Sequence, residues 1–242
     1  MPGTRSGALP RALRRAGLAL LLLVTALSLA RAPVSRAAEP NAADQGPGQP
    51  DGTVAHCFDG DTLKLRDRRV VRLAGIDAPE LGRGQTQPQY YAREAKAELE
   101  RLATGRQVAL LAAGVNDHDR HGRLVAELRL ADGRSLNELM VASGAAFFYP
   151  HRDLGPEFQE RLRDLQAQAI HERRGLWAHL LSLPLARETY VGNRASLRFF
   201  PVNCPEARHI KPRNRIHFGT LMDAFLAGYA PARICVFWPE AR

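Results

Sequence analysis

Short apolar segments separated by turn residues dominate the chain from about residue 53 to residue 73. Thr53–Cys57, Thr62–Leu65 and Arg69–Leu73 are rich in apolar or β-branched residues, and Asp59-Gly60 and Asp67-Arg68 separate them. Runs of this length with Asp-Gly between them are typical of strands joined by hairpins. The pattern therefore predicts that the folded part of the chain begins as a three-stranded meander.

The apolar spacing then changes to a helical one. Over Gln89–Ala103, apolar residues recur every three or four positions with charged residues between them, which predicts an amphipathic helix. Further strands are predicted over Val108–Ala112 and Leu124–Leu130, and further helices after the capping-box residue Ser135 and at Pro156. Five strands and three helices predict an α+β domain, and a small Greek-key barrel would close five strands without exposed edges.

The N-terminal residues have the features of a targeting segment. Residues 1–37 hold six arginines and no acidic residue, and an uncharged apolar run of 15 residues, Ala16–Ala30, follows four of these arginines. This pattern predicts a signal peptide, with Ser35 and Ala37 as the small residues before the cleavage point. A membrane span needs about 20 apolar residues, so we expect a secreted or periplasmic protein, with an uncleaved membrane anchor as the alternative. Residues 38–52 are polar and rich in Pro and Gly, which predicts a flexible linker.

The net charge of +9 suggests a nucleic-acid-binding protein until its distribution is considered. Beyond residues 1–37, 28 basic residues face 25 acidic ones. Residues 185–242, here called the C-terminal segment, carry nine basic and four acidic residues, whereas residues 38–184 carry 19 basic and 21 acidic ones. We expect this segment to be a small separate α+β module, and the overall charge alone says little about function.

Candidate chemistry is concentrated in one stretch of the predicted meander. Three carboxylates and one arginine fall within 20 residues, at Asp61, Arg72, Asp77 and Glu80. A glycine precedes Asp61 and a proline precedes Glu80, so sharp and stiff loops could hold the carboxylates together. Clustered oxygen ligands suit Ca²⁺ or Mg²⁺. Either fragment alone is more simply explained as an ordinary hairpin turn or loop.

Taken together, several segments resemble the staphylococcal-nuclease-like, or thermonuclease, family. The resemblance covers about residues 52–178 in collinear order and is carried by Asp59–Leu65, Val71–Glu80, Asp119–Ala126, Asp132–Val141, Gly144–Ala146 and Arg174–Trp177. It implies a five-stranded OB-like barrel with three helices over residues 53–180. It also implies a Ca²⁺-dependent nuclease that hydrolyses DNA and RNA with little sequence specificity and leaves 3′-phosphate ends.

The resemblance also assigns roles to individual residues. It implies that Asp61 and Asp77 coordinate Ca²⁺ through their side chains and that the main-chain carbonyl of Ala78 adds a third protein ligand. Three oxygen donors of this kind agree with the preference of Ca²⁺ for carboxylates and carbonyls.

The same resemblance implies that Glu80 activates or orients the attacking water and that Arg72 and Arg123 bind the phosphate. This fits the chemistry, because phosphodiester hydrolysis builds negative charge on the phosphoryl oxygens. A divalent cation and two guanidinium groups, each able to donate two parallel hydrogen bonds, stabilise that charge.

A non-catalytic OB-type module that binds nucleic acid without cutting it is the alternative function. The joint presence of the five charged residues named above weighs against it. We expect a monomer that takes nucleic acid as its substrate. The aromatic Tyr149 is either a nucleotide contact or the end of a strand.

The C-terminal segment resembles the small zinc-binding module related to the metal-binding domain of the Ada DNA-repair protein, but its metal ligands are incomplete. Its two cysteines, Cys204 and Cys235, would need further ligands such as His209 or His217 to form a tetrahedral zinc site. Because export places the segment in an oxidising compartment, we favour a disulfide between them over zinc. Cys57, in the first predicted strand, is expected to be a buried small residue.

Overall fold

The computed structural model describes residues 50–82, 84–114, 117–235 and 238–241. The predicted signal peptide and almost all of the predicted linker therefore lie outside the described residues. Within the described ranges, no helix is both long enough and apolar enough to cross a membrane.

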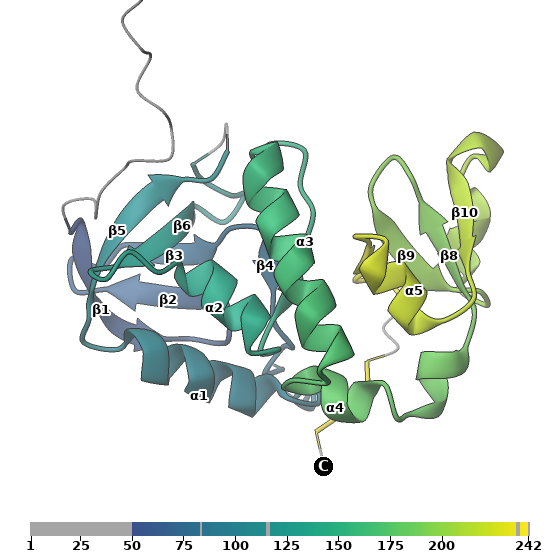
Figure 1. Ribbon diagram of the computed structural model, residues 1–242, viewed down its shortest axis with the longest axis horizontal. Helices are drawn as coiled ribbons and strands as arrows, with labels where there is room; N and C mark the ends of the chain where they lie inside the picture. Colours follow the sequence, from purple (N-terminus) through teal and green to yellow (C-terminus); the bar gives the residue numbers. More distant parts are fainter. Residues whose placement is uncertain (1–49, 83, 115–116, 236–237, 242) are drawn as a thin grey trace, which may run out of the picture. The chain divides into compact units, whose positions relative to one another are not determined.

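Five strands close into a barrel with the order β1-β2-β3-β6-β5 (Figure 1). Neighbouring strands are antiparallel except β3 and β6, which are parallel. The barrel strands are β1 (Gly52–Cys57), β2 (Thr62–Leu65), β3 (Val70–Leu73), β5 (Gln107–Ala112) and β6 (Leu124–Leu130). Each lies within one residue of its predicted bounds, and the closed barrel confirms the predicted α+β, OB-like fold class.

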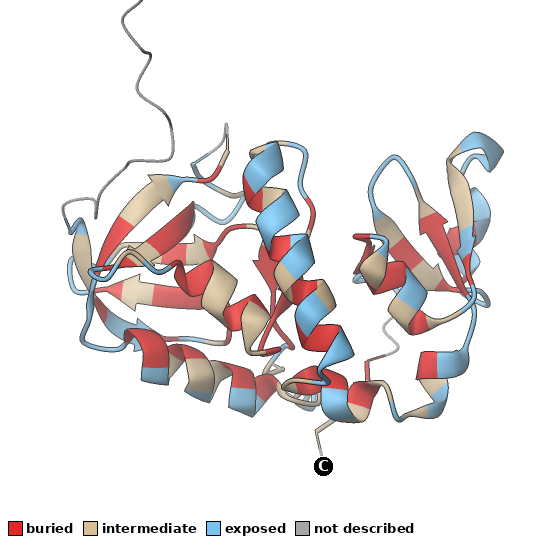
Figure 2. Ribbon diagram, in the orientation of Figure 1, coloured by how far each residue is buried: buried red, intermediate tan, exposed pale blue. Residues whose placement is uncertain are grey.

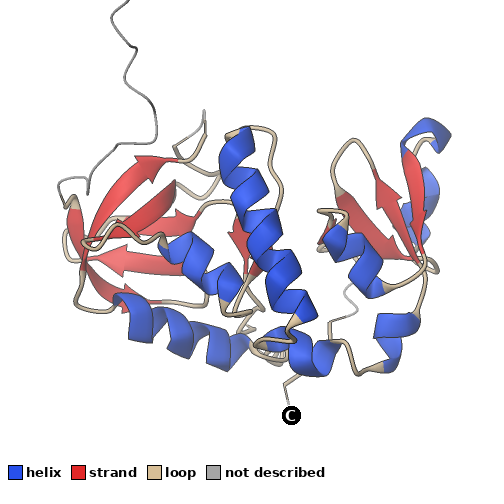
Figure 3. Ribbon diagram, viewed as in Figure 1, coloured by secondary structure: helices blue, strands red, loops and turns tan. Residues whose placement is uncertain are grey.

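Helices pack on the barrel and complete its core (Figure 3). They are α1 (Ala92–Ala103), α2 (Leu136–Ala142) and α3 (Pro156–His171), and the shorter α4 (Leu176–Leu180) follows. The face of α1 that is buried carries the apolar positions that predicted it, although the helix begins three residues later than expected. The Ser135 side chain caps α2 by accepting a hydrogen bond from the main-chain nitrogen of Glu138 at 3.4 Å.

A pair of very short strands, β4 (Ile76–Asp77) and β7 (Phe147–Phe148), lies beside the barrel. Asp77 is in register with Phe147, so a loop that leaves the barrel is fixed by a segment some 70 residues later in the chain. Two-residue strands carry no alternating pattern, and the sequence did not predict this pairing. It determines where Asp77 lies.

The buried side chain of Asn137 joins β3 to β6 at their parallel edge. Its Nδ2 donates to the carbonyl oxygens of Ala74 at 2.8 Å and Ala126 at 3.2 Å, and its Oδ1 accepts from the Leu128 nitrogen at 3.0 Å. Asn137 is fully buried near the start of α2, and Figure 2 shows in red the buried residues of the barrel and of the helices that pack on it. Three hydrogen bonds from one side chain therefore fasten the barrel next to Arg72.

The C-terminal segment forms its own four-stranded sheet with the order β10-β8-β9-β11. Its elements are η1 (Pro184–Arg187), β8 (Tyr190–Asn193), β9 (Arg198–Pro201), η2 (Pro205–His209), η3 (Pro212–Asn214), β10 (Arg215–Phe218), α5 (Leu221–Leu226) and β11 (Ala230–Pro231), where η marks a 3₁₀ helix. Cys204 and Cys235 form a disulfide, with their Cα atoms 5.9 Å apart. The favoured pairing is confirmed, and these two sulfurs are not available to zinc.

The C-terminal segment shares a hydrophobic core with the end of the barrel domain. Phe225 of α5 packs edge-on against Trp177 of α4, with ring centroids 4.8 Å apart, and against Phe147 of β7 at 5.6 Å. The buried Gln166 of α3 accepts from the Phe148 nitrogen at 2.8 Å and donates to the Phe225 carbonyl at 2.9 Å. The predicted boundary near Leu185 thus falls inside a continuous core.

Replacing Asn137 by Ala tests the fastening of β3 to β6. The change leaves the buried Leu128 N–H and the Ala74 carbonyl without the Asn137 partner, whereas the Ala126 carbonyl keeps the Ala74 N–H, and we expect the free energy of unfolding to fall by about 3 kcal/mol. For a chain of this size that corresponds to a drop in Tm of roughly 6–12 °C. Gln168→Ala, at an exposed position of α3, is the control and should change stability by no more than about 0.5 kcal/mol. Equal Tm values for the two variants would contradict this role.

Candidate active site

The two loops that carry the candidate carboxylates pack directly on one another. Asp61 ends the turn before β2, and Asp77 ends β4. A Cβ at Gly60 would lie 2.7 Å from the Cβ atoms of both Ala78 and Ala95, closer than any real contact. Glycine is therefore required at position 60 by the close approach of the loop at Ala78 and of helix α1 at Ala95, and not, as expected from the sequence, by a sharp turn.

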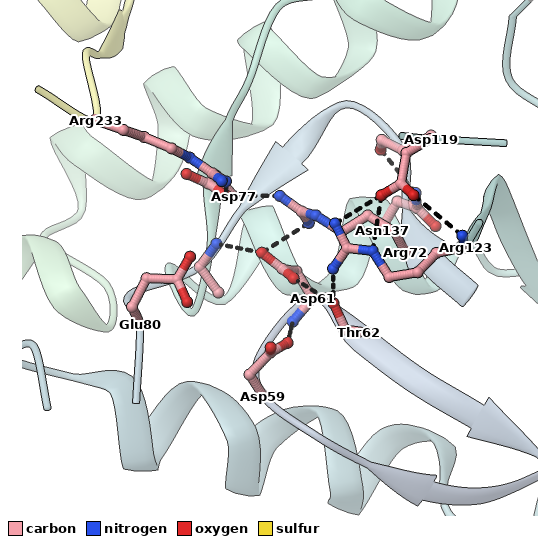
Figure 4. Close-up of polar contacts among 12 residues, drawn as sticks. Asp59, Asp61, Thr62, Arg72, Asp77, Glu80, Asp119, Arg123, Asn137 and Arg233 are labelled. Atoms are coloured by element: carbon pink, nitrogen blue, oxygen red, sulfur yellow. Dashed lines mark hydrogen bonds and ion pairs between the residues drawn. The ribbon is translucent and has the colours of Figure 1, made fainter. Parts of the chain in front are cut away.

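Arg72 of β3 lies between two buried aspartates (Figure 4). Its Nη1 is 2.7 Å from Oδ2 of Asp61, and its Nη2 is 2.6 Å from Oδ1 of Asp77. Asp61 and Asp77 are only 5% and 7% exposed, so these charges interact in a poorly solvated environment. Asp61 Oδ2 also accepts the main-chain N–H of Ala78 at 3.0 Å, which ties the two loops together.

The cluster carries more negative than positive charge. Burial opposes the charge of Arg72, but Asp61 and Asp77 outweigh it and raise the pKa of the guanidinium. Burial raises the pKa of Asp77 to about 6 despite the neighbouring arginine. Burial and the adjacent Asp61 carboxylate likewise raise the pKa of Asp59 to about 7. Both shifts have the sign expected for buried carboxyl groups, for which desolvation disfavours the charged form.

Arg123, the residue immediately before β6, is held by a residue that the sequence analysis did not single out. Its Nε donates to Asp119 Oδ2 at 2.7 Å, and its Nη1 donates to the Thr62 hydroxyl at 3.3 Å. Burial works against ionisation of Asp119, but the hydrogen bonds from Arg123 prevail and lower its pKa. Thr62 in turn donates to Asp61 at 2.9 Å, so the second guanidinium is linked to the first cluster.

The side chain of Glu80 is exposed beside the cluster. Its main-chain nitrogen donates to Oε1 of Gln89 at 2.8 Å, and the Gln89 nitrogen donates back to the Glu80 carbonyl at 2.9 Å. Among the described residues, no side chain pairs with the Glu80 carboxylate. The loop is thus fixed through its backbone, while the carboxylate stays available to water.

The predicted site residues line adjoining cavities. Asp61, Arg72, Glu80 and Arg123 line one of about 410 Å³, and Asp77 and Ala78 line a neighbouring one of about 180 Å³ that Glu80 also borders. The sequence analysis missed three polar residues of this region: Asp59, Asp119 and Arg233. Asp119 lies four residues before Arg123, a spacing that could have indicated a pair, whereas nothing local to Arg233 indicated its position.

The donor set of this cluster fits a hard divalent cation. Asp61 and Asp77 each place a carboxylate oxygen against the guanidinium of Arg72, one at Nη1 and the other at Nη2. Burial raises the pKa values of Asp59 and Asp77, and a bound cation would favour their ionised forms. In the described part of the chain, no three His, Cys, Asp or Glu side chains are arranged to hold a metal ion. Two carboxylates would therefore need a main-chain carbonyl and water to complete the coordination.

Comparison with known proteins agrees with this geometry. Residues 70–179 match the family described as staphylococcal nuclease homologue. An uncharacterized endonuclease of Escherichia coli is 32% identical over 136 residues, covering 55% of this chain and 80% of that protein. The micrococcal nuclease of Shigella flexneri is 31% identical over 156 residues, covering 60% and 81%. The thermonuclease of Staphylococcus hyicus is 30% identical over 132 residues, covering 52% and 75%.

The chain belongs to the staphylococcal nuclease family. It is accordingly a hydrolase of that type, a nuclease, and the resemblance on which its fold was predicted is confirmed. The family match ends at residue 179, so the likeness of the C-terminal segment to the Ada module stays a prediction. The roles of the individual site residues also stay predictions, which the geometry makes testable.

The contacts of Arg123 in this nuclease allow a test of whether the guanidinium acts through its planar geometry or only through its charge. Asp119 and Thr62 fix the plane of the guanidinium, and a lysine can reproduce its charge but not its two-pronged donation. We expect Arg123→Lys to lower kcat for nucleic-acid cleavage nearly as far as Arg123→Ala, on the order of 10²-fold. Near-wild-type kcat in the lysine variant would show that Arg123 acts only as a general positive charge.

Proposed function

We propose that this protein is an exported, calcium-dependent endonuclease that acts as a monomer on DNA and RNA with little sequence specificity. It hydrolyses phosphodiester bonds so that 3′-phosphate ends remain. One observation carries the proposal: Asp61, Arg72, Glu80 and Arg123 line one cavity, and Asp77 contacts Arg72 at its edge. A module that only binds nucleic acid has no need to bury two carboxylates around one arginine, because such burial is costly.

In this proposal, Asp61, Asp77 and the main-chain carbonyl of Ala78 hold Ca²⁺. The bound ion would offset charge on the phosphoryl oxygens and orient the reacting groups. A cation next to Asp61 and Asp77 would weaken their hold on Arg72. Nη1 of Arg72 is already buried without a hydrogen-bond partner among the described residues, although it lies close to Asp61. A cation that drew Asp61 away from Nη1 would free this donor for a phosphate oxygen.

The remaining residues act on the phosphate and the water. Arg72 and Arg123 bind the equatorial oxygens, where negative charge develops in the transition state. Glu80 accepts a proton from the water whose oxygen attacks phosphorus. The bond from phosphorus to the 5′ oxygen breaks, and that oxygen takes up a proton, so a 3′-phosphate and a 5′-hydroxyl result.

Broad substrate choice follows from the groups involved. Guanidinium contacts to phosphate carry no sequence information, and neither they nor the carboxylates depend on a 2′-hydroxyl. The proposal of activity on both DNA and RNA rests on this and on the family resemblance.

The proposal of export rests on the predicted signal peptide and is supported by the disulfide Cys204–Cys235. Disulfides persist in secreted and periplasmic proteins and are rare in the cytosol. The buried Cys57 has no such partner, and burial raises the pKa of its thiol to about 11. It is thus protected from oxidation in the same compartment.

Asp61→Asn tests the metal assignment. The variant keeps the size of the side chain but removes a carboxylate charge from the proposed calcium site, and we expect cleavage in Ca²⁺ to fall by at least about 10²-fold. Chelation of Ca²⁺ should have the same effect on the wild type. Cleavage products should carry 3′-phosphates by end-group analysis.

Asp67→Asn is the matched control, because Asp67 is an exposed aspartate in the turn before β3 that pairs only with Arg69 among the described residues. It should retain wild-type activity. Undiminished cleavage by folded Asp61→Asn, or by the wild type in excess chelator, would refute the calcium assignment.

A further inference from the structure

A residue of the C-terminal segment reaches the active site. Nη2 of Arg233 donates to Oδ1 of Asp77 at 2.8 Å, across a sequence separation of 156 residues (Figure 4). The same oxygen already accepts from Arg72 at 2.6 Å. Asp77 has one negative charge and two guanidinium partners on one oxygen, so Arg233 is not needed to neutralise it.

The position of Arg233 is fixed from both sides along the chain. Two residues before it, β11 pairs with β9 through Pro231 and Phe199, and two residues after it Cys235 is bonded to Cys204. Farther on, the Trp238 ring nitrogen donates to the Tyr90 carbonyl at 3.1 Å. The segment thus crosses from its own sheet to the loop before α1 and carries Arg233 past Asp77.

Arg233 lies where two cavities meet. It lines the catalytic cavity of about 410 Å³ and also a larger one of about 760 Å³, which Arg72 and Arg123 border as well. The wall of the larger cavity contributed by the C-terminal segment includes Arg198 and Phe200. The guanidinium carbon of Arg198 lies 3.7 Å from the ring centroid of Tyr149, which follows β7. A polynucleotide that leaves the catalytic cavity on this side must pass Arg233.

The side chain of Arg233 is 55% exposed, in contrast to the 11% of Arg72. A half-exposed guanidinium can turn to a new acceptor at little cost in desolvation, whereas Arg72 cannot. If Asp77 binds a metal ion, Arg233 loses its acceptor and its donors face the cavity. Phosphate is the acceptor that arginine matches best through two parallel hydrogen bonds.

We propose that Arg233 is a substrate-binding residue, supplied to the nuclease site by the C-terminal segment, that binds a phosphate of the strand next to the scissile one. This inference rests on the proposed function, since it concerns the substrate of the same site. It gives the C-terminal segment a role in substrate affinity that its basic charge alone would not specify. Arg198 stacks on Tyr149, and together they form part of the cavity wall along which the nucleic-acid strand would run.

Steady-state cleavage of a short single-stranded DNA in saturating Ca²⁺ tests the proposal with Arg233→Ala and Arg233→Lys. For the alanine variant we expect KM to rise about tenfold, as the loss of one charged hydrogen bond implies, with kcat nearly unchanged. The dependence of log KM on log salt concentration should become shallower by about 0.7, the value for one phosphate contact on a single strand. The lysine variant keeps the charge and should restore most of the salt dependence.

A dinucleotide with a single phosphate separates binding of the scissile phosphate from binding of the neighbouring one. It has no neighbouring phosphate, so the wild type and Arg233→Ala should have the same KM for it. Arg213→Ala, at an exposed basic position outside these cavities, removes the same charge from the C-terminal segment and should leave both substrates unaffected.

Equal KM values and salt dependence for wild type and Arg233→Ala on the longer strand would overturn the inference while leaving the nuclease assignment intact. A lower Ca²⁺ requirement with unchanged KM in Arg233→Ala would also overturn it, because Arg233 would then be a competitor of the metal for Asp77. Absence of cleavage by the wild type in Ca²⁺ would instead refute the proposed function itself.

Discussion

The buried ion pairs of Arg72 with Asp61 and Asp77 constrain the rest of the structure. Removing one partner from such a cluster typically costs about 3–5 kcal/mol, because a buried charge is left without compensation. The sequence therefore has to bring two separate loops to one guanidinium on β3. Gly60 permits the loops to touch, the Ala78 nitrogen joins them by a hydrogen bond, and the pairing of β4 with β7 fixes the second loop.

This arrangement stabilises the fold poorly but suits catalysis. The pKa values of Asp59 and Asp77 are raised mainly because the two carboxyls are buried, and the neighbouring Asp61 carboxylate adds to the effect. Buried, crowded carboxylates are unfavourable in a site that serves only stability, and under the proposed function they would favour binding of a cation and then of a phosphate. The second guanidinium, Arg123, has its own carboxylate partner in Asp119, which fixes its orientation, and it is linked to the first cluster through the hydroxyl of Thr62.

Local sequence patterns predicted the elements of the barrel well. Strand and helix periodicity, the Asp-Gly turn and the Ser135 cap are all set by neighbouring residues, and these features agree with the structure. The predicted site residues, all of which precede position 124, could be named because they lie in short sequence segments that occur in the same order as in the family. The sequence did not predict contacts between residues that are far apart in the chain. The two-residue strands β4 and β7 have no periodicity. The position of Arg233 beside Asp77 depends on the disulfide and on the core around Phe225, which join distant parts of the chain.

The most direct test of the central claim, that this charge cluster is a calcium site, is thermal unfolding with and without Ca²⁺ in the absence of substrate. An ion present at a concentration of about 100 times its Kd for the folded state adds about 2.7 kcal/mol to the stability of that state. This raises Tm by roughly 5–11 °C in a chain of this size. We predict that rise in the wild type and its loss in Asp77→Asn. No Ca²⁺-dependent rise in the wild type, or an equal rise in Asp77→Asn, would contradict the account.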